Sequence, residues 1–381
     1  MQVTGTWLHH PGAQAVCRML TDAGHQALFV GGCVRNDLLN APVGDIDIAT
    51  DAHPDKVISL AGKAGLKAIP TGIEHGTITV VAHDVPHEVT TFRKDVETDG
   101  RRAIVSFTSD PSVDAARRDF TMNALYATPD GEIVDPLGGL DDLRARRVRF
   151  IGDAAQRMRE DYLRILRYFR FLAWYGDRSL GTDADTLAEI AAHLDGLDQL
   201  ADERITAEFV KLLRAPDPAP VLGVMHEVGV LPRCLPAAHV PSLAAYLHLA
   251  QEAAPEPFLP AKLAALRAPE GGHRLRLDKA TARDWERVRK LAENGSNPAE
   301  MGYRHGAGIA IQAMLVRAAL TGHADPDAAA EAARGAAASF PVTAQDLMPR
   351  FKGKALGEKL REIEARWIAS DFTLDRDALL S

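Results

Sequence analysis

The residue pattern of this chain changes once along its length, and that change limits the folds that it can adopt. Between residues 26 and 126, short apolar runs of β-prone residues alternate with turns and one or two helical stretches. After residue 153 these runs end, and amphipathic segments rich in Ala, Leu, Arg and Glu follow. The pattern therefore predicts an α/β-type first half and an all-helical remainder, with no internal repeat.

Length, charge and cysteine content exclude several classes of protein. With 381 residues, the chain is longer than one hydrophobic core usually organises, so two or more domains are expected. A formal net charge of -8 argues against a protein that coats nucleic acid nonspecifically, because Lys and Arg drive such binding. Any nucleic-acid partner therefore needs a local basic surface. The three cysteines, Cys17, Cys33 and Cys234, have no zinc-ligand spacing and are typical of a reducing compartment.

Hydropathy predicts no membrane segment. The N-terminal residues lack the pattern of a signal peptide. No apolar run approaches the roughly 18 residues that a membrane span needs. We therefore expect a cytoplasmic protein without a membrane partner.

Residues 28–50, LFVGGCVRNDLLNAPVGDIDIAT, contain a pattern that is typical of phosphate binding. LFV predicts a strand, Gly31 and Gly32 a turn, VRNDLL a short helix and DIDIAT a returning strand. Two glycines at a strand-to-helix turn allow backbone N–H groups to approach a phosphate, and the helix N-terminus adds partial positive charge. Arg35, one turn into the helix, is placed to reach the same phosphates.

Asp45 and Asp47 lie two residues apart on the returning strand. Both carboxylates are therefore expected on one face, with Ile46 and Ile48 toward the core. Mg²⁺ prefers oxygen ligands and often takes one or two carboxylates together with substrate phosphates. A plain turn and a solvated strand face fit each part alone, but the combination favours a magnesium-dependent nucleotidyltransferase with Asp45 and Asp47 as metal ligands.

Two later motifs add candidate residues. Glu88, on a strand of alternating pattern, is a candidate third active-site carboxylate, although an edge-strand Glu paired with a neighbouring Arg fits the pattern equally well. Residues 95–107 contain Gly and many charges, which predict a mobile loop. Arg117 and Arg118 lie beside Asp119, an arrangement that on its own fits a surface ion-pair cluster.

Residues 159–176, REDYLRILRYFRFLAWYG, have the strongest helical pattern of the chain. The polar residues that recur every third position on one broad face are Asp161, Arg164, Arg167 and Arg170. An Asp and an Arg one turn apart can imitate the hydrogen-bonding edge of a base. An ordinary ion pair on an exposed helix, worth only about a few tenths of a kcal/mol, is the alternative.

Three motifs together resemble those of the polymerase-β-like nucleotidyltransferases. They are GG-x-VR followed by D-x-D, RRDFTMNA at 117–124 and EDYLRILRYFRF at 160–171. The similarity is to their branch of class II tRNA CCA-adding enzymes and bacterial poly(A) polymerases. It implies an α+β head with a mixed or antiparallel sheet, followed by an all-α neck, body and tail. The ranges expected are 1–140 for the head, 141–197 for the neck, 198–300 for the body and 301–381 for the tail. Where the branch usually has Asp after its first arginine, this chain has Asn36, which bears on the loop rather than on metal binding.

The resemblance also implies roles for residues. The catalytic carboxylates would be Asp45, Asp47 and Glu88, and the nucleotide-binding residues Gly32, Arg35, Arg118, Asp161, Arg164, Arg167 and Arg170. Asp161 and Arg164 would read the base of CTP or ATP, with Glu160 orienting Arg164. Residues 144–149, Arg157 and Arg159 would supply the local basic surface. The body and tail would grip the acceptor and T arms of tRNA.

The predicted activity is template-independent addition of CCA to the 3′ end of tRNA from CTP and ATP, with Mg²⁺ as cofactor and no DNA partner. A poly(A) polymerase, or an enzyme that adds only CC or only A, shares these motifs. The tail lacks the long, strongly basic extension that would favour a poly(A) polymerase. A catalytically idle RNA-binding protein on the same fold is an alternative of another class, against which the intact Asp45, Asp47, Arg118, Asp161 and Arg164 argue.

Overall fold

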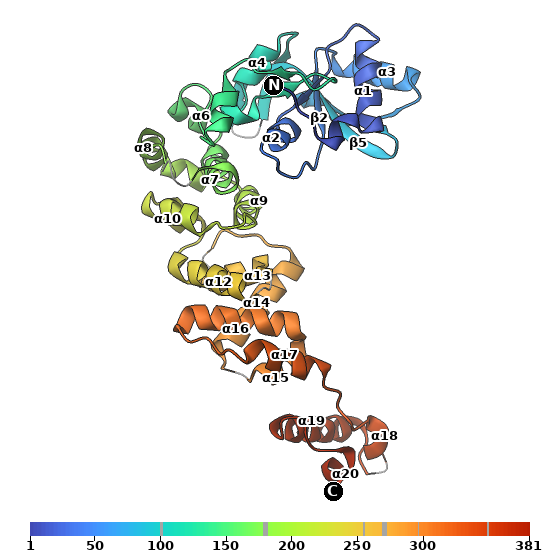
Figure 1. Cartoon of the computed structure of the whole chain (residues 1–381), viewed down its shortest axis with the longest axis vertical. Coiled ribbons are helices and arrows are strands. Elements are labelled where there is room, and N and C mark those ends of the chain that lie inside the picture. Colours follow the sequence, from blue (N-terminus) through green and yellow to red (C-terminus); the bar gives the residue numbers. More distant parts are fainter. Residues whose placement is uncertain (100–101, 178–181, 254–255, 269–272, 296, 349) are drawn as a thin grey trace. The chain divides into compact units, whose positions relative to one another are not determined.

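The computed structural model describes residues 1–99, 102–177, 182–253, 256–268, 273–295, 297–348 and 350–381 (Figure 1). Internal contacts divide the chain into two compact units. The first consists of residues 1–215 with 227–230, and the second of residues 216–226 with 231–381. The boundaries predicted at residues 140, 197 and 300 stay predictions. Among the helices in the described ranges, none is long and apolar enough to cross a membrane.

A seven-stranded mixed sheet organises the N-terminal part of the first unit. Its strands are β1 (Leu28–Val30), β2 (Asp47–Thr50), β3 (Lys67–Gly72), β4 (Thr77–Ala82), β5 (Val85–Thr91), β8 (Tyr126–Ala127) and β9 (Ile133–Val134), in the order β3-β4-β5-β2-β1-β8-β9. β2 and β5 pair in parallel, and the other neighbours pair antiparallel. This sheet confirms the predicted α+β head. β2 begins at Asp47, so Asp45 precedes the strand instead of lying within it as predicted.

Both faces of the sheet centre are covered, which explains why its strands read as apolar runs. All three residues of β1 are buried. Helices α1 (Pro11–Thr21) and α3 (Pro54–Lys63) pack against β3, β4 and β5 on the face of Ile48 and Val89. The opposite face carries a buried cluster that consists of Leu28, Val30, Ala49, Phe92, Ala115, Ala124, Tyr126 and Ile151. Asp47 and Glu88 lie on this second face, because side chains alternate along a strand.

Shorter elements complete the head. They are η1 (Thr6–His9), α2 (Gly32–Leu38), η2 (Ile73–His75), α4 (Pro111–Ala116), η3 (Thr121–Asn123) and α5 (Gly139–Arg144). His83 and Asp84 connect β4 to β5 with positive φ angles of 52° and 61°.

The segment predicted as a mobile loop at 95–107 forms most of a β-hairpin. β6 (Arg93–Asp99) and β7 (Arg102–Phe107) pair antiparallel as a separate two-stranded sheet, with an irregularity between Asp95 and Glu97. The tip, residues 100 and 101, lies outside the described residues. The prediction was wrong for the two strands because a hairpin can satisfy its backbone hydrogen bonds internally while its residues remain strongly polar.

The helix predicted to run through residues 159–176 is broken. α6 (Ala154–Glu160) ends at Glu160, and α7 (Leu163–Tyr175) begins three residues later. Asp161 lies between them in extended backbone, with φ -158° and ψ 105°. Its Oδ1 accepts a hydrogen bond from Leu163 N at 3.1 Å, and such a local side-chain bond favours a helix start over a helix interior.

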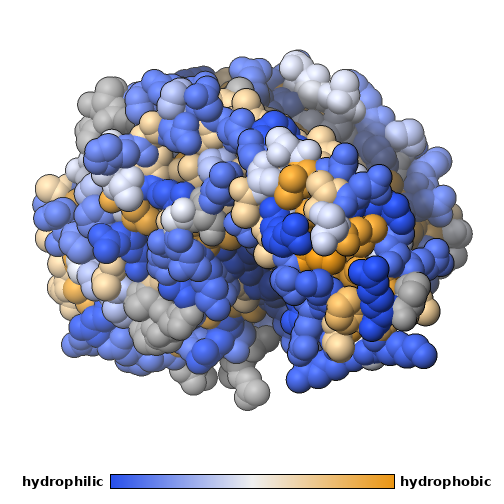
Figure 2. Space-filling model, turned by 90° about the horizontal axis from the view of Figure 1, so that it is seen from below, coloured by the Kyte–Doolittle hydropathy of each residue, from blue (hydrophilic) through white to orange (hydrophobic). Residues whose placement is uncertain are grey.

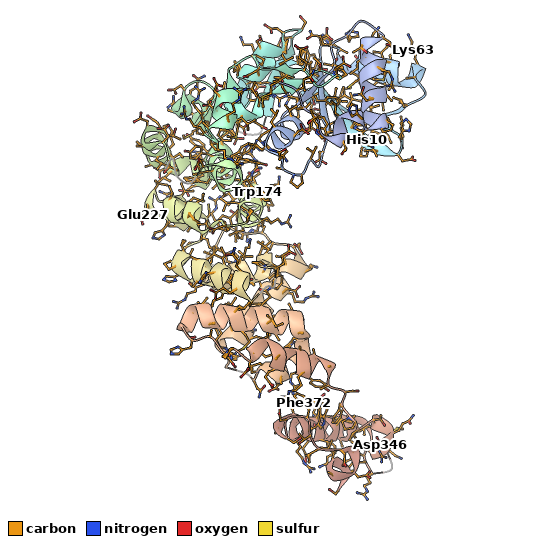
Figure 3. All side chains as sticks on the ribbon, viewed as in Figure 1. His10, Lys63, Trp174, Glu227, Asp346 and Phe372 are labelled. Carbon is orange, nitrogen blue, oxygen red and sulfur yellow. The ribbon has the colours of Figure 1, made fainter. Side chains whose placement is uncertain are left out.

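The remaining described helices of the first unit are α8 (Ala184–Ala192), η5 (Leu194–Gln199) and α9 (Asp202–Leu213). Among them, α9 packs against α7 and α8 packs against α6. Phe150 stacks on Tyr168 of α7 with ring centroids 5.7 Å apart, and Phe120 contacts Phe171 at 4.8 Å. Trp174, labelled in Figure 3, donates its indole N–H to Lys211 O on α9 at 2.8 Å. Aromatic packing and this bond therefore fix α7 against both its neighbours.

The second unit is all-helical in its described residues, as predicted. Its helices are α10 (Ala219–Glu227), α11 (Val230–Cys234), α12 (Val240–Glu252), α13 (Leu259–Ala265), α14 (Lys279–Glu293), α15 (Pro298–His305), α16 (Ala307–Thr321), α17 (Ala328–Ala337), α18 (Ala344–Leu347), α19 (Gly353–Ala369) and α20 (Arg376–Leu380), of which α10 and α11 each extend into the first unit. Trp367 contacts Tyr303 and Phe372, whose side chain is labelled in Figure 3. The face drawn in Figure 2 is mostly hydrophilic, with hydrophobic residues in small groups.

Candidate active site

Gly31 makes the turn between β1 and α2. Its φ of 72° and ψ of -114° lie in a region that suits glycine and strains other residues. A Cβ placed on it would lie 3.6 Å from Arg118 Nη1 and 3.6 Å from Asn123 Oδ1. The turn predicted to hold a phosphate therefore packs against the RRDFTMNA segment. Gly32 follows as the first residue of α2 and is partly exposed.

The register of the sheet brings Asp47 beside both Glu88 and this turn. The parallel pairing sets Asp47 opposite Glu88, which places the two side chains on one face. The antiparallel pairing sets Phe29 opposite Ile48, so the next residue, Val30, lies opposite Asp47. The chain then turns at Gly31. The Gly31 turn, predicted to bind phosphate, and the predicted carboxylates Asp47 and Glu88 are thus neighbours in space.

The pKa of Asp47 shows how crowded with negative charge this position is. Burial, followed by the charges of Glu88 and Asp45, raises the pKa of Asp47 from 3.8 to about 6, and Arg118 opposes the rise. Asp45 and Glu88 are both exposed, while Asp47 is half-buried. The three carboxylates therefore repel one another, and a divalent cation would relieve that repulsion.

The number and the chemistry of these carboxylates determine which metal ion they suit. Among the described residues, no group of three or more His, Cys, Asp or Glu is arranged to hold a metal. Mg²⁺ often takes only one or two carboxylates and completes its octahedron with water and substrate phosphates. Asp45 and Asp47, with hard oxygen donors and excess negative charge, fit that mode of binding.

Arg118 lies next to the carboxylates and is held by a buried acid. Asp114 Oδ2 accepts from Arg118 Nη2 at 3.0 Å and from the Tyr126 hydroxyl at 2.7 Å, and its Oδ1 accepts from Arg117 Nε at 2.8 Å. Burial alone would raise the pKa of Asp114, but Arg118 and Arg117 lower it to about 2. The alternative interpretation as a surface ion-pair cluster is thus wrong, because Asp114 is buried and fixes the Arg118 guanidinium. Asp114 had not been predicted, although its position four residues before Arg118 on a helix was a usable signal.

Arg35 is buried, with 6% of its surface exposed. Its Nη1 donates to Asn123 Oδ1 at 2.8 Å, and its Nη2 donates to the Tyr175 hydroxyl at 2.8 Å. Its guanidinium also lies 4.2 Å from the centre of the Tyr175 ring. Arg35 therefore joins α2 to α7, and its predicted phosphate contact stays a prediction.

Asn36 makes two kinds of bond that a carboxylate could not combine. Its Oδ1 accepts from Arg35 Nε at 3.1 Å and Nη2 at 2.9 Å, while its Nδ2 donates to Pro42 O at 2.8 Å. The neutral amide thus supports both Arg35 and the loop that leads to Asp45. The neighbouring Asp37 accepts from Trp7 Nε1 at 2.8 Å and Thr4 N at 3.0 Å.

Arg164 and Asp161 do not pair with each other through their side chains. Arg164 Nη1 donates to Glu160 Oε2 at 2.5 Å, the contact that the resemblance implied. Asp161 Oδ2 accepts from Arg204 Nη2 of α9 at 2.8 Å. Asp161 keeps further lone pairs, since a carboxylate accepts about four hydrogen bonds. Arg204 was not predicted, and nothing in its local sequence distinguishes it from other helical arginines.

Arg167 and Arg170 are held by buried carboxylates from other elements. Asp119 Oδ2 accepts from Arg167 Nε at 2.7 Å and also from its Nη2. Glu208 of α9 accepts from Arg170 Nε at 2.6 Å. Both acids were missed as site residues. Glu208 is buried and follows Ile205 at helical spacing on the apolar face of α9, so an acid on that face was a signal that a buried cation lies nearby.

The structure also corrects one part of the predicted basic surface. Arg157 is only 8% exposed, and its guanidinium bonds to Glu160 and to the backbone oxygens of Arg117 and Arg118. Its guanidinium is buried because those carbonyls lie at the end of α4 and need hydrogen-bond donors. Arg147 and Arg149 do expose more than half of their side chains.

Two family models match parts of this chain. The family model described as "Poly A polymerase head domain" matches residues 27–149, and the one described as "Probable RNA and SrmB- binding site of polymerase A" matches residues 182–240. The chain is 41% identical over 234 residues to the CCA-adding enzyme of Anoxybacillus flavithermus, covering 61% of this chain and 56% of that protein. It is 40% identical over 222 residues to the mouse mitochondrial CCA tRNA nucleotidyltransferase 1, covering 58% of this chain and 51% of that protein. The chain thus spans about half the length of these curated relatives.

Solved structures extend the likeness over most of the chain. The CCA-adding enzyme of Bacillus stearothermophilus in complex with CTP superposes with a TM-score of 0.75 and 29% identity, covering 95% of this chain and 93% of that one. The Thermotoga maritima CCA-adding enzyme complexed with tRNA_CCA gives a TM-score of 0.70 at 17% identity, covering 99% and 95%, which supports the fold alone.

Proposed function

We propose, from the premise that this chain belongs to the family of class II tRNA CCA-adding enzymes and bacterial poly(A) polymerases, that it adds CCA to the 3′ end of tRNA from CTP and ATP and releases pyrophosphate. The observation that carries the proposal is the set of mutually repelling carboxylates Asp45, Asp47 and Glu88 beside the Gly31 turn. This is the arrangement that nucleotidyl transfer needs, because a triphosphate and a cation must meet at one point.

Asp45 and Asp47 are the proposed ligands of Mg²⁺. The ion would supply neutralisation of phosphate charge and activation of the attacking hydroxyl. Glu88 faces the same side of the sheet and adds negative charge there. Its exposure leaves it available as a further ligand or as an acceptor for the attacking hydroxyl.

The arginines are proposed to position the nucleotide. Arg118, fixed by Asp114, lies at the Gly31 turn and is placed to contact the triphosphate together with Gly32. Arg167 and Arg170 present remaining donors from rigid ion pairs. Since the side chains are already ordered, little conformational entropy is lost when a nucleotide binds.

Asp161 and Arg164 are proposed to select the base. Glu160 fixes Arg164 and Arg204 fixes Asp161, so a donor fork and an acceptor are held near the α6–α7 break. Such a pair can read the hydrogen-bonding edges of cytosine and adenine without a template. The helical second unit is the proposed grip for the acceptor and T arms of tRNA.

The proposed compartment is the cytoplasm. Cys17 and Cys33 are buried thiols outside any disulfide, and Cys234 is buried as well, as is usual for cysteines of a reducing compartment.

The deciding experiment incubates the protein with Mg²⁺, CTP, ATP and a tRNA transcript that lacks its 3′ CCA, and sizes the product. Growth by three nucleotides followed by arrest is the expected result. A long A tail would indicate a poly(A) polymerase, and growth by CC or A alone a partial enzyme. No growth would contradict the proposal and favour a catalytically idle RNA-binding protein. Asp84→Asn, an exposed residue in the β4–β5 turn, is the matched control for substitutions at Asp45 and Asp47.

A further inference from the structure

A cavity of about 730 Å³ lies in the first unit among β6, α4 and α6. Cavities of this size hold small organic ligands. None of the ten residues predicted for the catalytic and nucleotide sites lines it. Its wall combines apolar Val113 and Ala116 with charged side chains, and those charges determine what it can bind.

Cations outnumber free carboxylates in the cavity wall. Lys94, Arg117 and Arg157 face Asp95 and Glu160. Glu160 Oε2 already accepts from both Arg157 and Arg164, at 2.5 Å each. Arg117 shares its own partner, Asp114, with Arg118. The acids near the cavity therefore carry too few negative charges to neutralise the arginines that they contact.

Two guanidinium groups strengthen this imbalance: that of Arg157 in the cavity wall, and that of Arg93, which precedes Lys94 on β6 and lies outside the wall. Nε and Nη1 of Arg93, and Nε of Arg157, are buried and have no acceptor among the described residues. Burial, followed by the charge of Arg117, lowers the pKa of Arg93 to about 10. Burying like charges side by side costs free energy, and an anion in the cavity would offset that cost.

We propose that this cavity binds a phosphate group. Two sources have the same chemistry: a backbone phosphate of the tRNA acceptor strand, which rests on the proposed function, and the pyrophosphate that the reaction releases. Guanidinium groups are the preferred partners of phosphate, because their planar donor fork matches its oxygens. Glu160 connects Arg157 of the cavity wall to Arg164, so the bound phosphate lies beside the proposed base-reading residues.

The test uses Arg93→Gln, Lys94→Gln and the double variant in the full chain. Neither residue is among the predicted catalytic or nucleotide-binding residues. Arg18→Gln is the matched control, because it removes one positive charge at an exposed position of α1, which covers the other face of the sheet. Arg93→Gln should keep the melting temperature, since Nε and Nη1 of Arg93 are buried without an acceptor in the described residues. If it fails to fold, Lys94→Gln, an exposed residue, still decides the question.

Two measurements distinguish the sources. If the cavity binds RNA, the slope of log K against log salt for a tRNA transcript lacking CCA should become shallower by about 0.7 to 0.9 per lost phosphate contact. If it binds the product, affinity for inorganic pyrophosphate, measured by calorimetry without RNA, should fall about tenfold while the RNA slope stays unchanged. Arg18→Gln should alter neither quantity.

Unchanged slope and unchanged pyrophosphate affinity in the double variant would overturn the proposal. Failure of the wild-type protein to extend tRNA would instead contradict the proposed function, and the pyrophosphate measurement would still test the cavity.

Discussion

The carboxylates at the end of β2 and those around α7 have opposite surroundings. Within the described residues, no ion pair joins Asp45, Asp47 or Glu88 to a cation, and the pKa of Asp47 is raised to about 6. Around α7, by contrast, four acids of the described residues each accept from an arginine. These pairs are Glu160–Arg164, Asp161–Arg204, Asp119–Arg167 and Glu208–Arg170.

This difference separates two uses of negative charge. A repelling cluster stores free energy that a bound cation releases, so its members are suited to binding a metal rather than to stability. A buried acid that neutralises arginines instead orders donors for a ligand, and its loss leaves charges buried without partners. Removing one carboxylate should therefore stabilise the first region and destabilise the second.

The largest expected effect is that of Asp47→Asn on activity. Loss of a metal ligand should lower nucleotide addition at least about a thousandfold, roughly 4 kcal/mol of activation free energy. The same change removes a charge that the fold disfavours, so the metal-free variant should be more stable by about 1 to 2 kcal/mol. Single-turnover addition and chemical unfolding measure the two effects. Asp84→Asn should change neither, and a less stable Asp47→Asn protein would contradict the comparison.

Glu208→Ala should have the opposite effect on stability. It leaves Arg170 without its 2.6 Å partner and should cost about 3 kcal/mol of unfolding free energy. The double variant Glu208→Leu with Arg170→Met should recover most of this loss, because an apolar pair of similar volume can replace a buried ion pair. Urea unfolding measures both. A loss below about 1 kcal/mol in Glu208→Ala would show that the pair is solvent-screened.

The pH dependence of metal binding tests the raised pKa directly. A proton competes with Mg²⁺ for Asp47, so at subsaturating Mg²⁺ activity should fall about tenfold per pH unit below about 6. For stability the sign is reversed: the folded pKa exceeds the unfolded one, so the contribution of Asp47 in the metal-free protein is favourable at low pH and is lost as the pH rises through about 6. Glu88→Gln should move the metal-binding midpoint to lower pH, because the Glu88 charge raises the pKa of Asp47. A midpoint near pH 4 in the unaltered protein would contradict the charge-crowding argument.

Arg204→Met tests the region around α7 without changing a residue that the sequence predicted for the site. Asp161 would lose the donor that holds its Oδ2, and discrimination between CTP and ATP should weaken by about threefold to tenfold, near 1 kcal/mol. The readout is the ratio of kcat/KM for the two nucleotides at each step of addition. Arg18→Met, an exposed position on α1, is the control. An unchanged ratio would mean that Arg204 has no part in positioning Asp161.

Strand alternation and turn residues predicted an α/β-type first half, a helical remainder and a shared side for Asp45 and Asp47, because these signals determine local direction. The mixed sheet and the placing of Glu88 with the two aspartates were implied by the family resemblance. The sequence did not predict the partners that hold the arginines. Arg204 and Glu208 lie on α9, more than thirty residues after the arginines and acids they contact, and only tertiary packing brings them together. The break at Asp161 was missed for a different reason. The three-residue spacing of charges continues through it, while the Asp161 side chain accepts from Leu163 N and so favours the start of a new helix there.

The smallest expected effect concerns Asn36, where both regions meet through Arg35. Asn36→Asp adds charge to the bonds from Arg35 Nε and Nη2 but loses the donor to Pro42 O. A charge-assisted gain and a lost hydrogen bond, each about 1 kcal/mol, should nearly cancel in global stability. The loop before Asp45 should nevertheless open more often, because its backbone loses the bond at Pro42. Hydrogen exchange should therefore quicken in residues 39–44 while the melting temperature changes little. Equal exchange in both proteins would show that Ala41 N bonding to Asn36 O at 2.8 Å suffices to hold the loop.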